Sequence, residues 1–314
     1  MACESLNGGK MGIKSFFELK EKVLKMSAKR VSVAAAHDKD VIESIVESMK
    51  VGIVRKPILI GDAQKIEKII KDFGENLNDF EIVDSSSDEE SGKLAVKSIK
   101  EKKAEILVKG KLETVFYLKP ILDKETGIKK SGVLSNLTLF EMPSYHKFIS
   151  VTDNAIIPVP TMEEKKYIIE NTKILYNALE IETPKVALLS ALEVINTKVE
   201  STIDAACLTQ MYQRGQIKGF IIDGPLAYDT AIDKKSADSK KLKGSEVAGD
   251  PDILIVPNLE SGNILGKAYK FHAEAKSGGV VLGASVPVVL NSRSDGADRR
   301  FNSMLIARAI AELV

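Results

Sequence analysis

The chain has 314 residues, 44 % of them hydrophobic, so it is long enough for about two domains and can bury a sizeable core. Its 45 lysines and arginines nearly balance 44 aspartates and glutamates, and the net charge of +1 argues against a nucleic-acid-binding protein. No apolar run reaches the ~20 residues of a membrane span, no signal peptide opens the sequence, and two cysteines fit a reducing compartment. These features predict a cytoplasmic globular protein without a membrane or nucleic-acid partner.

Short β-branched runs alternate with amphipathic segments through the first half of the chain. The strand-like runs are residues 31–36, 56–61, 80–83 and 106–108. Helical spacing of apolar residues marks 38–49, the segment after Asp62, and 92–101. The polar, acidic stretch 84–92 between them is typical of a solvated connection. Such alternation predicts βαβ units and a mostly parallel sheet.

The middle of the chain breaks this alternation. Two extended runs, 133–140 and 148–152, follow one another with no helix between, so we expect them to pair antiparallel. Alternation then resumes. Helices are predicted over 163–179, 203–211 and 297–313, and strands over 186–190, 220–222, 253–256 and 280–290.

A lysine-rich segment, 232–247, interrupts the second half. It carries Lys234, Lys235, Lys240, Lys241 and Lys243 among serines and a glycine. One interpretation is a solvated surface loop, as charge runs usually are. The other is a cationic flap over a polyphosphate ligand. The sequence is compatible with both interpretations of this segment.

Four predicted strands end in polar turns that contain glycine. These turns are Lys109-Gly110, Asp223-Gly-Pro-Leu226, Pro257-Asn-Leu-Glu-Ser-Gly-Asn263 and Asn291-Ser-Arg-Ser-Asp-Gly296. In open parallel α/β sheets, ligands bind outside the carboxyl ends of the strands. Together the four turns therefore predict a ligand-binding cleft.

The turn at Asn291 to Gly296 has the features of an anion site. It precedes the last predicted helix, where free N–H groups and the helix dipole favour negative charge. Arg293 adds a planar, permanently charged group that matches phosphate geometry. The alternative is that Ser292 or Asp295 merely caps the helix and Arg293 points to water.

Other common site signatures are missing. Neither the Gly-x-x-x-x-Gly-Lys-Ser/Thr phosphate loop nor Gly-x-Gly-x-x-Gly occurs, and there is no Gly-x-Ser-x-Gly elbow. His37, His146 and His272 lie far apart, so we expect no metal site. Cys207 lies in an apolar helical context, which favours a buried inert thiol.

Longer motifs carry a resemblance to one family. They are Asp223-Gly-Pro-Leu-Ala-Tyr-Asp-Thr-Ala231, Val247-Ala-Gly-Asp250 with Gly262-Asn263, and Pro287-Val-Val-Leu-Asn-Ser-Arg-Ser-Asp295. From about Gly12 onward the chain resembles the phosphate acetyltransferase/phosphate butyryltransferase family, whereas residues 1–11 lie outside the resemblance. The butyryl branch fits better, because acetyl enzymes typically read Asp-Leu-Ser-Arg-Gly where this chain has Leu290-Asn-Ser-Arg-Ser294.

The resemblance implies a reaction and an architecture. The reaction is reversible transfer of a butyryl or similar acyl group from coenzyme A to inorganic phosphate, with no tightly bound cofactor. The architecture is two three-layer α/β/α domains that flank a cleft, as in isocitrate and isopropylmalate dehydrogenases. By that comparison residues 1–148 plus 286–314 form one domain and 149–285 the other. A homo-oligomer and a metabolic link to an acyl-phosphate kinase are also implied.

The resemblance also suggests roles for individual residues. Arg293 would bind and orient phosphate, and Ser292 would stabilise the oxyanion or the departing thiolate. The acetyl branch has an aspartate seven residues after the serine, where this chain has Arg299, so Asp295 and Asp298 are the substitutes for a base. The expected substrate-binding residues are Lys109, Asp223, Gly224, Pro225, Gly262 and Asn263.

Three alternatives remain at the level of sequence. One is a phosphate acetyltransferase, because one methylene in an apolar pocket is worth only about 1–3 kcal/mol. The second is a metal- and nicotinamide-dependent decarboxylating dehydrogenase on the same architecture, although no pattern for a metal or a cofactor loop is recognisable. The third is a coenzyme A-binding module without turnover.

Overall fold

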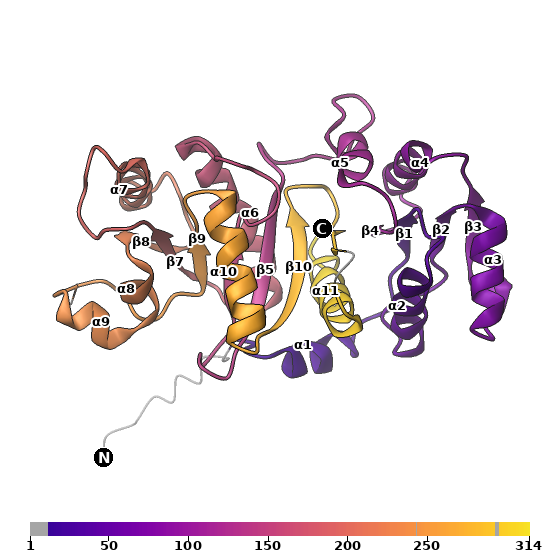
Figure 1. Cartoon of the computed structure of the whole chain (residues 1–314), viewed down its shortest axis with the longest axis horizontal. Helices are drawn as coiled ribbons and strands as arrows, with labels where there is room; N and C mark the ends of the chain where they lie inside the picture. The colour runs from indigo at the N-terminus through magenta and orange to yellow at the C-terminus, as the bar shows by residue number, and fades with distance from the viewer. Residues whose placement is uncertain (1–11, 243, 293–294) are drawn as a thin grey trace, which may run out of the picture.

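A continuous sheet runs through the molecule from end to end (Figure 1). The computed structural model describes residues 12–242, 244–292 and 295–314. Within these residues the sheet has 11 strands in the order β3-β2-β1-β4-β11-β10-β5-β6-β9-β7-β8. The strands are β1 Val31–Ala34, β2 Ile58–Gly61, β3 Glu81–Asp84, β4 Ile106–Lys109, β5 Ser135–Glu141, β6 Ile149–Thr152, β7 Lys185–Leu189, β8 Ile221–Leu226, β9 Ile253–Ile255, β10 Lys276–Leu282 and β11 Val288–Val289.

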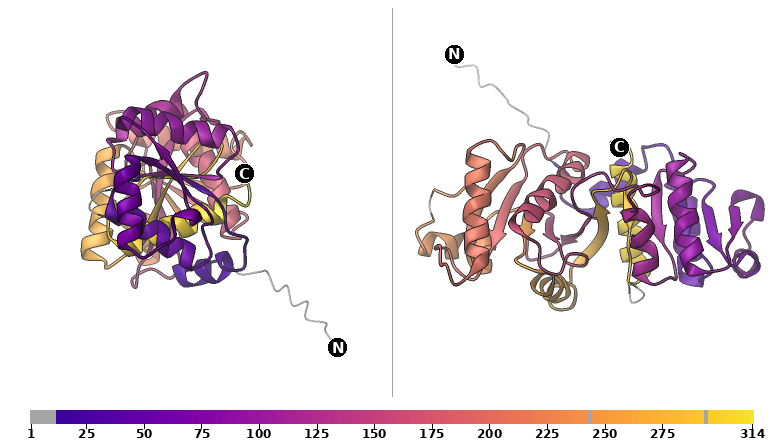
Figure 2. Two further views of the ribbon diagram at one scale, coloured as in Figure 1. Left: turned by 90° about the vertical axis from the view of Figure 1, so that its right-hand side faces the viewer. Right: turned by 90° about the horizontal axis from the view of Figure 1, so that it is seen from above.

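Helices cover both faces of this sheet (Figure 2). The helices are α1 Phe16–Val23, α2 Lys39–Lys50, α3 Ala63–Asp72, α4 Asp88–Lys100, α5 Thr114–Leu122, α6 Met162–Ala178, α7 Glu200–Gln213, α8 Tyr228–Ile232, α9 Lys234–Ser239, α10 Leu259–His272 and α11 Ala297–Ile310, with a 3-10 turn at Leu77–Asp79. No helix in the described part of the chain is long and apolar enough to cross a membrane.

Two parallel blocks meet at an antiparallel centre. Strands β1 to β4 and β11 pair parallel, and so do β6, β9, β7 and β8. Between the blocks, β5 pairs antiparallel with β10 and with β6. The predicted α/β class, the mostly parallel sheet and the antiparallel pair at the middle of the chain are all confirmed. The predicted boundary after residue 148 falls between β5 and β6, and this division stays a prediction.

The core follows from the alternation of side chains along the strands. On β4, Ile106 and Val108 join a large cluster on one face, packed against helices that include α2, α6 and α11, whereas Leu107 joins a second cluster on the other face. That other face carries two separate clusters. One lies beneath α4 and α5, and the other beneath α8, α9 and α10. The interval between these two clusters is where a cleft can open.

Three predicted segments differ from the structure. The strand predicted over 280–290 is two antiparallel strands, β10 and β11, because the chain turns at Gly283, whose φ of 95° is the left-handed conformation that glycine tolerates. The acidic connection predicted at 84–92 is partly helix, since the Ser87 side chain caps α4 and three acidic residues stabilise its first turn. The lysine-rich segment contains α9, capped by Asp233. The prediction that the Cys207 thiol is buried is wrong, because this residue lies on the exposed face of α7.

Candidate active site

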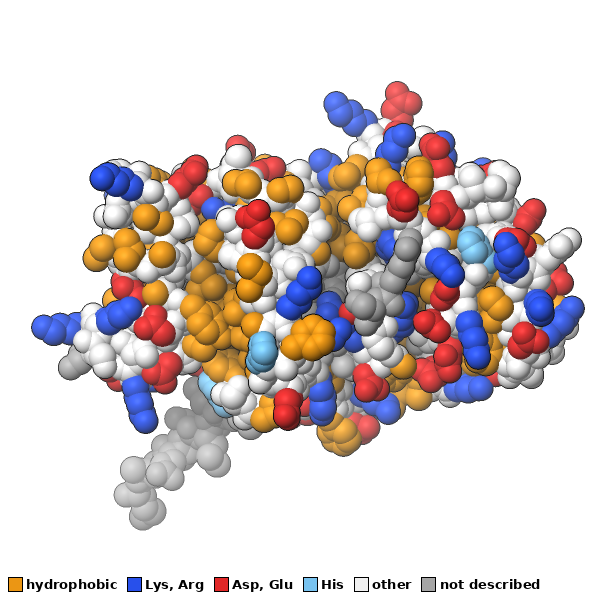
Figure 3. Space-filling model, viewed as in Figure 1, with side chains coloured by type: hydrophobic (Ala, Val, Ile, Leu, Met, Phe, Trp, Pro, Cys, Tyr) orange, Lys and Arg blue, Asp and Glu red, His pale blue; other side chains and the backbone are white. Residues whose placement is uncertain are grey.

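A cleft of about 590 Å³ opens between the two smaller core clusters. Its floor is β5, whose alternate residues Asn136, Thr138 and Phe140 face the opening. One wall is built from the ends of β4 and β11 and the turn before α11. The other wall is α10 and the turn after β6. Figure 3 shows the hollow near the middle of one face, with Lys and Arg side chains around it.

Ser292 lies on the first wall, in a turn that a buried carboxylate organises. The Asp295 side chain is 3 % exposed, and its Oδ2 accepts a 2.8 Å hydrogen bond from the backbone N–H of Ser292. Arg300 donates from Nε to the Asp295 carbonyl oxygen at 3.1 Å, which holds the turn from behind. Ser292 is exposed, whereas Asp295 and Arg300, which orient its backbone, are buried.

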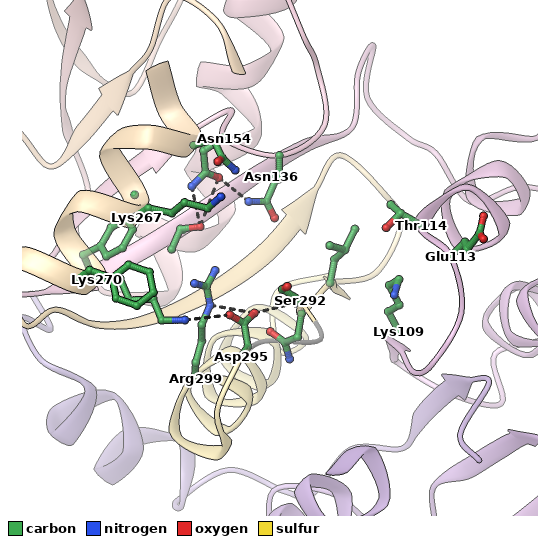
Figure 4. A pocket seen from close by; sticks show the side chains of 18 of the residues that line it. Lys109, Glu113, Thr114, Asn136, Asn154, Lys267, Lys270, Ser292, Asp295 and Arg299 are labelled. Carbon is green, nitrogen blue, oxygen red and sulfur yellow. Dashed lines mark hydrogen bonds and ion pairs between the residues drawn. The ribbon is translucent and has the colours of Figure 1, made fainter. Parts of the chain in front are cut away.

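The same carboxylate is held between two cations from different helices. Lys270 Nζ of α10 lies 3.5 Å from Asp295 Oδ1, and Arg299 Nε of α11 lies 3.3 Å from Oδ2 (Figure 4). Among the described lining residues four are cations and two are carboxylates, namely Lys109, Lys267, Lys270, Arg299, Glu113 and Asp295. This excess of positive charge suits anionic ligands.

An amide and hydroxyl cluster occupies the floor. Asn154, in the turn after β6, accepts at Oδ1 a 2.6 Å hydrogen bond from Asn136 Nδ2 and donates from Nδ2 to Thr138 Oγ1 at 3.0 Å. All three residues are at most 8 % exposed, and all line the cleft. They tie β5 to the turn after β6 and present polar groups to a bound ligand.

Asp153 fixes the turn that carries Asn154. Its carboxylate accepts hydrogen bonds from the backbone N–H groups of Ala155, Ile156 and Ile157 at 2.8, 3.0 and 3.2 Å. Burial nevertheless raises the pKa of Asp153 to about 6, because desolvation of the charged form outweighs the hydrogen bonds that favour it. Asp153 is 2 % exposed and positions the turn without lining the cleft.

Helix α10 presents one face to the cleft. Asn263, Gly266, Lys267 and Lys270 follow the three- and four-residue spacing of a single helical face, and all four line the opening. An Asn258 capping box begins the helix. Gly262 lies behind Asn263, where a Cβ would approach the Asp153 carbonyl oxygen at 2.9 Å. Here glycine permits the close approach of α10 to the turn after β6.

The structure brings together part of the predicted site. Lys109, Asn263, Ser292 and Asp295 line the cleft, and Gly262 packs directly behind it. Asp298 is exposed in the first turn of α11 and does not line it. Arg293 falls outside the described residues.

The Asp223 turn lies elsewhere. Asp223, Gly224 and Pro225 are on the edge strand β8, which β9 and β7 separate from β6, and none of them lines the cleft. The binding role predicted for these three residues stays a prediction.

The lysine-rich segment is also away from the cleft. Lys240 pairs with Glu193 at 2.7 Å and with Asp229 at 3.5 Å, and Lys234 pairs with Asp238 at 3.0 Å. None of the described residues of this segment lines the cleft. The geometry favours the surface interpretation over the flap, and Lys243 falls outside the described residues.

Sequence reasoning missed the floor of the cleft and most of its cations. Asn136 and Thr138 interrupt an otherwise apolar strand on one face, a period-two signal that was available. Lys267 and Lys270 lie on the same helical face as Asn263, and their spacing in the sequence also indicates this. The ion pair of Lys270 with Asp295 could not be predicted, because the two residues lie on different elements that only the fold brings together.

Comparisons with known proteins place the chain in a family. A model of the family described as phosphate acetyl/butaryl transferase matches residues 90–308. The phosphate butyryltransferase of Clostridium acetobutylicum is 40 % identical over 95 % of this chain and 99 % of its own length. The phosphate acetyltransferase of Thermotoga maritima is 37 % identical over 93 % of this chain and 99 % of its own. The crystal structure of a branched-chain phosphotransacylase from Enterococcus faecalis matches with a TM-score of 0.79 and 30 % identity, over 91 % of this chain and 99 % of that one.

The chain thus combines an α/β fold with a cleft in which, among the described residues, cations outnumber carboxylates, as suits anionic ligands. The chain belongs to the phosphate acetyl/butaryl transferase family. It is a phosphate acyltransferase, whose substrates are an acyl-coenzyme A and phosphate.

Proposed function

We propose that this chain is a phosphate butyryltransferase, which transfers a butyryl or similar short or branched acyl group between coenzyme A and inorganic phosphate. The observation that carries the proposal is the neighbourhood of Ser292. Two apolar side chains of one core cluster, Leu112 and Leu290, line the cleft on the same wall as Ser292. Beside them lie the cations around Asp295. An acyl chain and a phosphate thus have adjacent surfaces of matching chemistry.

The proposed step is direct attack of phosphate on the thioester. A phosphate oxygen forms a bond to the carbonyl carbon, the carbon–sulfur bond breaks, and coenzyme A leaves as a thiolate. The proton of monohydrogen phosphate ends on that thiolate, so acyl phosphate and free coenzyme A balance the reaction without a cofactor. Holding both anions in one cleft lowers the entropic cost of their encounter.

Two residues of the turn before α11 have proposed roles in this step. Ser292 donates a hydrogen bond to the oxyanion or the thiolate, the groups that gain charge in the transition state. Arg293 binds phosphate through its planar guanidinium, a role that rests on the family motif. Asn263 on the opposite wall, and Lys109 on the same wall as Ser292, contact the remaining parts of the substrates.

No metal is part of the proposal. Within the ranges that the structure describes, no three His, Cys, Asp or Glu side chains come close enough together to hold a metal ion. The proposal includes a homo-oligomer and a metabolic link to an acyl-phosphate kinase, because such a kinase uses the acyl phosphate formed here. Light scattering during gel filtration tests the oligomer.

Thiol release tests the proposed function. Free coenzyme A is measured with a thiol reagent from acetyl-, butyryl- and branched acyl-coenzyme A, with and without inorganic phosphate. We expect release to require phosphate and kcat/KM to be higher for butyryl- than for acetyl-coenzyme A. A preference for acetyl-coenzyme A would make the chain a phosphate acetyltransferase instead, and release without phosphate would indicate a thioesterase.

A further inference from the structure

The Asp295 carboxylate, three residues after Ser292, faces two cations, so its single negative charge does not balance both of them. Asp295 Oδ2 receives the Ser292 N–H at 2.8 Å and faces Arg299 Nε at 3.3 Å, while Oδ1 faces Lys270 Nζ at 3.5 Å. One negative charge is therefore shared by two positive groups. Figure 4 shows the terminal nitrogens of Arg299 pointing past Asp295 into the cleft.

We propose that Arg299, supported by Lys270, binds the inorganic phosphate beside Ser292, and that Asp295 is a positioning residue and not the base. This rests on the proposed function. A guanidinium whose Nε faces Asp295 can present its two terminal amino groups as the fork that suits two phosphate oxygens. Arg299 is 24 % exposed at its side chain and Lys270 28 %, so both are accessible from the cleft.

The position of Arg299 relative to Ser292 indicates whether it binds inorganic phosphate or a phosphate of coenzyme A. Asp295 links the guanidinium to the Ser292 backbone through contacts of 3.3 and 2.8 Å, so an anion on Arg299 is a neighbour of the thioester carbonyl. The phosphates of coenzyme A are separated from its sulfur by the whole pantetheine arm. They cannot reach Arg299 while the thioester lies at Ser292. The anion is therefore the attacking phosphate.

The same geometry argues against Asp295 as a proton acceptor. Its charge is neutralised by Lys270 and Arg299, its side chain is 3 % exposed, and one oxygen already accepts the Ser292 N–H. Among the described residues Arg300 also packs on this turn, and it donates to the Asp295 backbone oxygen. Monohydrogen phosphate is abundant near neutral pH, because the second pKa of a phosphate group is about 6, so the nucleophile needs no carboxylate base.

Steady-state kinetics of Arg299 variants test the binding role. In Arg299→Gln we expect KM for phosphate to rise about ten- to a hundredfold, the worth of a charge-assisted hydrogen bond, with KM for butyryl-coenzyme A nearly unchanged. Arg299→Lys restores part of the affinity. Arg55→Gln, the same change at an arginine outside the cleft, leaves both KM values unchanged. A rise in KM for butyryl-coenzyme A alone, or no change in either KM, would overturn the assignment.

The melting temperature with and without inorganic phosphate tests phosphate binding by Arg299 independently of turnover. Inorganic phosphate raises the melting temperature of a protein that binds it in the folded state. We expect that rise to shrink in Arg299→Gln while the rise caused by coenzyme A persists. If phosphate raised the melting temperature of Arg299→Gln as much as that of wild type, Arg299 would not be the phosphate-binding residue. This result does not depend on thiol release, so failure of the Arg299 assignment can be distinguished from failure of the proposed function.

Asp295→Asn separates positioning from base catalysis. The amide oxygen can still accept the Ser292 N–H, so we expect kcat to fall modestly while the acid limb of the pH–rate profile remains, since phosphate itself sets it. Loss of the acid limb together with a drop of about 10²- to 10⁴-fold in kcat would identify Asp295 as the base and refute the positioning role.

Discussion

Ser292 is the residue to which the proposed reaction assigns stabilisation of the developing negative charge. It is exposed on the wall of the cleft, whereas Asp295 and Arg300 hold its turn from the buried side. Ser292→Ala removes the hydroxyl and leaves that support intact. We expect kcat to fall about 10²- to 10³-fold, the worth of one donor to a developing oxyanion, with an unchanged melting temperature. Parallel kinetics and calorimetry check this, and a kcat within a factor of two of wild type would remove Ser292 from the reaction.

We expect Asp153 to make the stability of the protein depend on pH. Its pKa is about 6 in the folded chain against an ordinary value of 3.8, so the folded state binds more protons between these pH values. The free energy of unfolding therefore falls as pH rises from about 4 to 6, by on the order of 3 kcal/mol from this residue, and is constant above.

The comparison with Asp153→Asn isolates that contribution. The asparagine cannot ionise, so the stability of wild type relative to the variant should fall through the same pH range. Urea unfolding of both proteins at several pH values measures the difference. A difference that does not vary with pH would show that Asp153 titrates as an ordinary carboxyl.

At the scale of elements, the cleft depends on how closely α10 approaches the turn after β6. A Cβ at Gly262 would lie 2.8 Å from Val256 Cγ2, 2.9 Å from the Asp153 carbonyl oxygen and 3.0 Å from Asn154 Cβ. Gly262→Ala should therefore cost about 1–3 kcal/mol of unfolding free energy and displace Asn154, lowering activity.

A second glycine supplies the control for that change. Gly244, in the lysine-rich segment, has nothing within 4 Å of its Cβ position, so Gly244→Ala should leave stability and activity near wild type. Denaturant titration and the thiol assay measure both variants. Equal behaviour of the two variants would mean that α10 has room to move and does not define the cleft.

The sequence patterns predicted the helices and strands better than the contacts between residues that lie far apart in the chain. The strand–helix alternation identified the parallel blocks, and the missing helix between 140 and 148 identified the antiparallel β5–β6 pair. The β10–β11 turn was missed, although Gly283, Ser285 and Pro287 interrupt the apolar run and are typical of a turn. Ser292 and Asp295 were found because they share one turn. Asn136, Asn154 and Lys270 come together only through the fold, so their partnership could not be read along the chain.

At the scale of the whole molecule, charge is nearly balanced but unevenly placed. The net charge is +1, yet four cations and two carboxylates line the described part of the cleft. We expect KM for acyl-coenzyme A, which is strongly anionic, to rise severalfold when ionic strength is raised from about 0.05 to 0.5 M with a salt that does not resemble phosphate. A neutral solute at equal osmolality is the control. A KM that does not respond to salt would argue against electrostatic capture in the cleft.

Exchange of labelled coenzyme A into butyryl-coenzyme A tests whether phosphate held in the cleft attacks the thioester directly. Without phosphate, a direct mechanism offers no acyl acceptor and no intermediate, so we predict no exchange. Exchange should begin when phosphate is added, because acyl phosphate then forms and reverts. Rapid exchange in the absence of phosphate would show that the acyl group passes to the protein first, and would contradict direct attack of phosphate on the thioester.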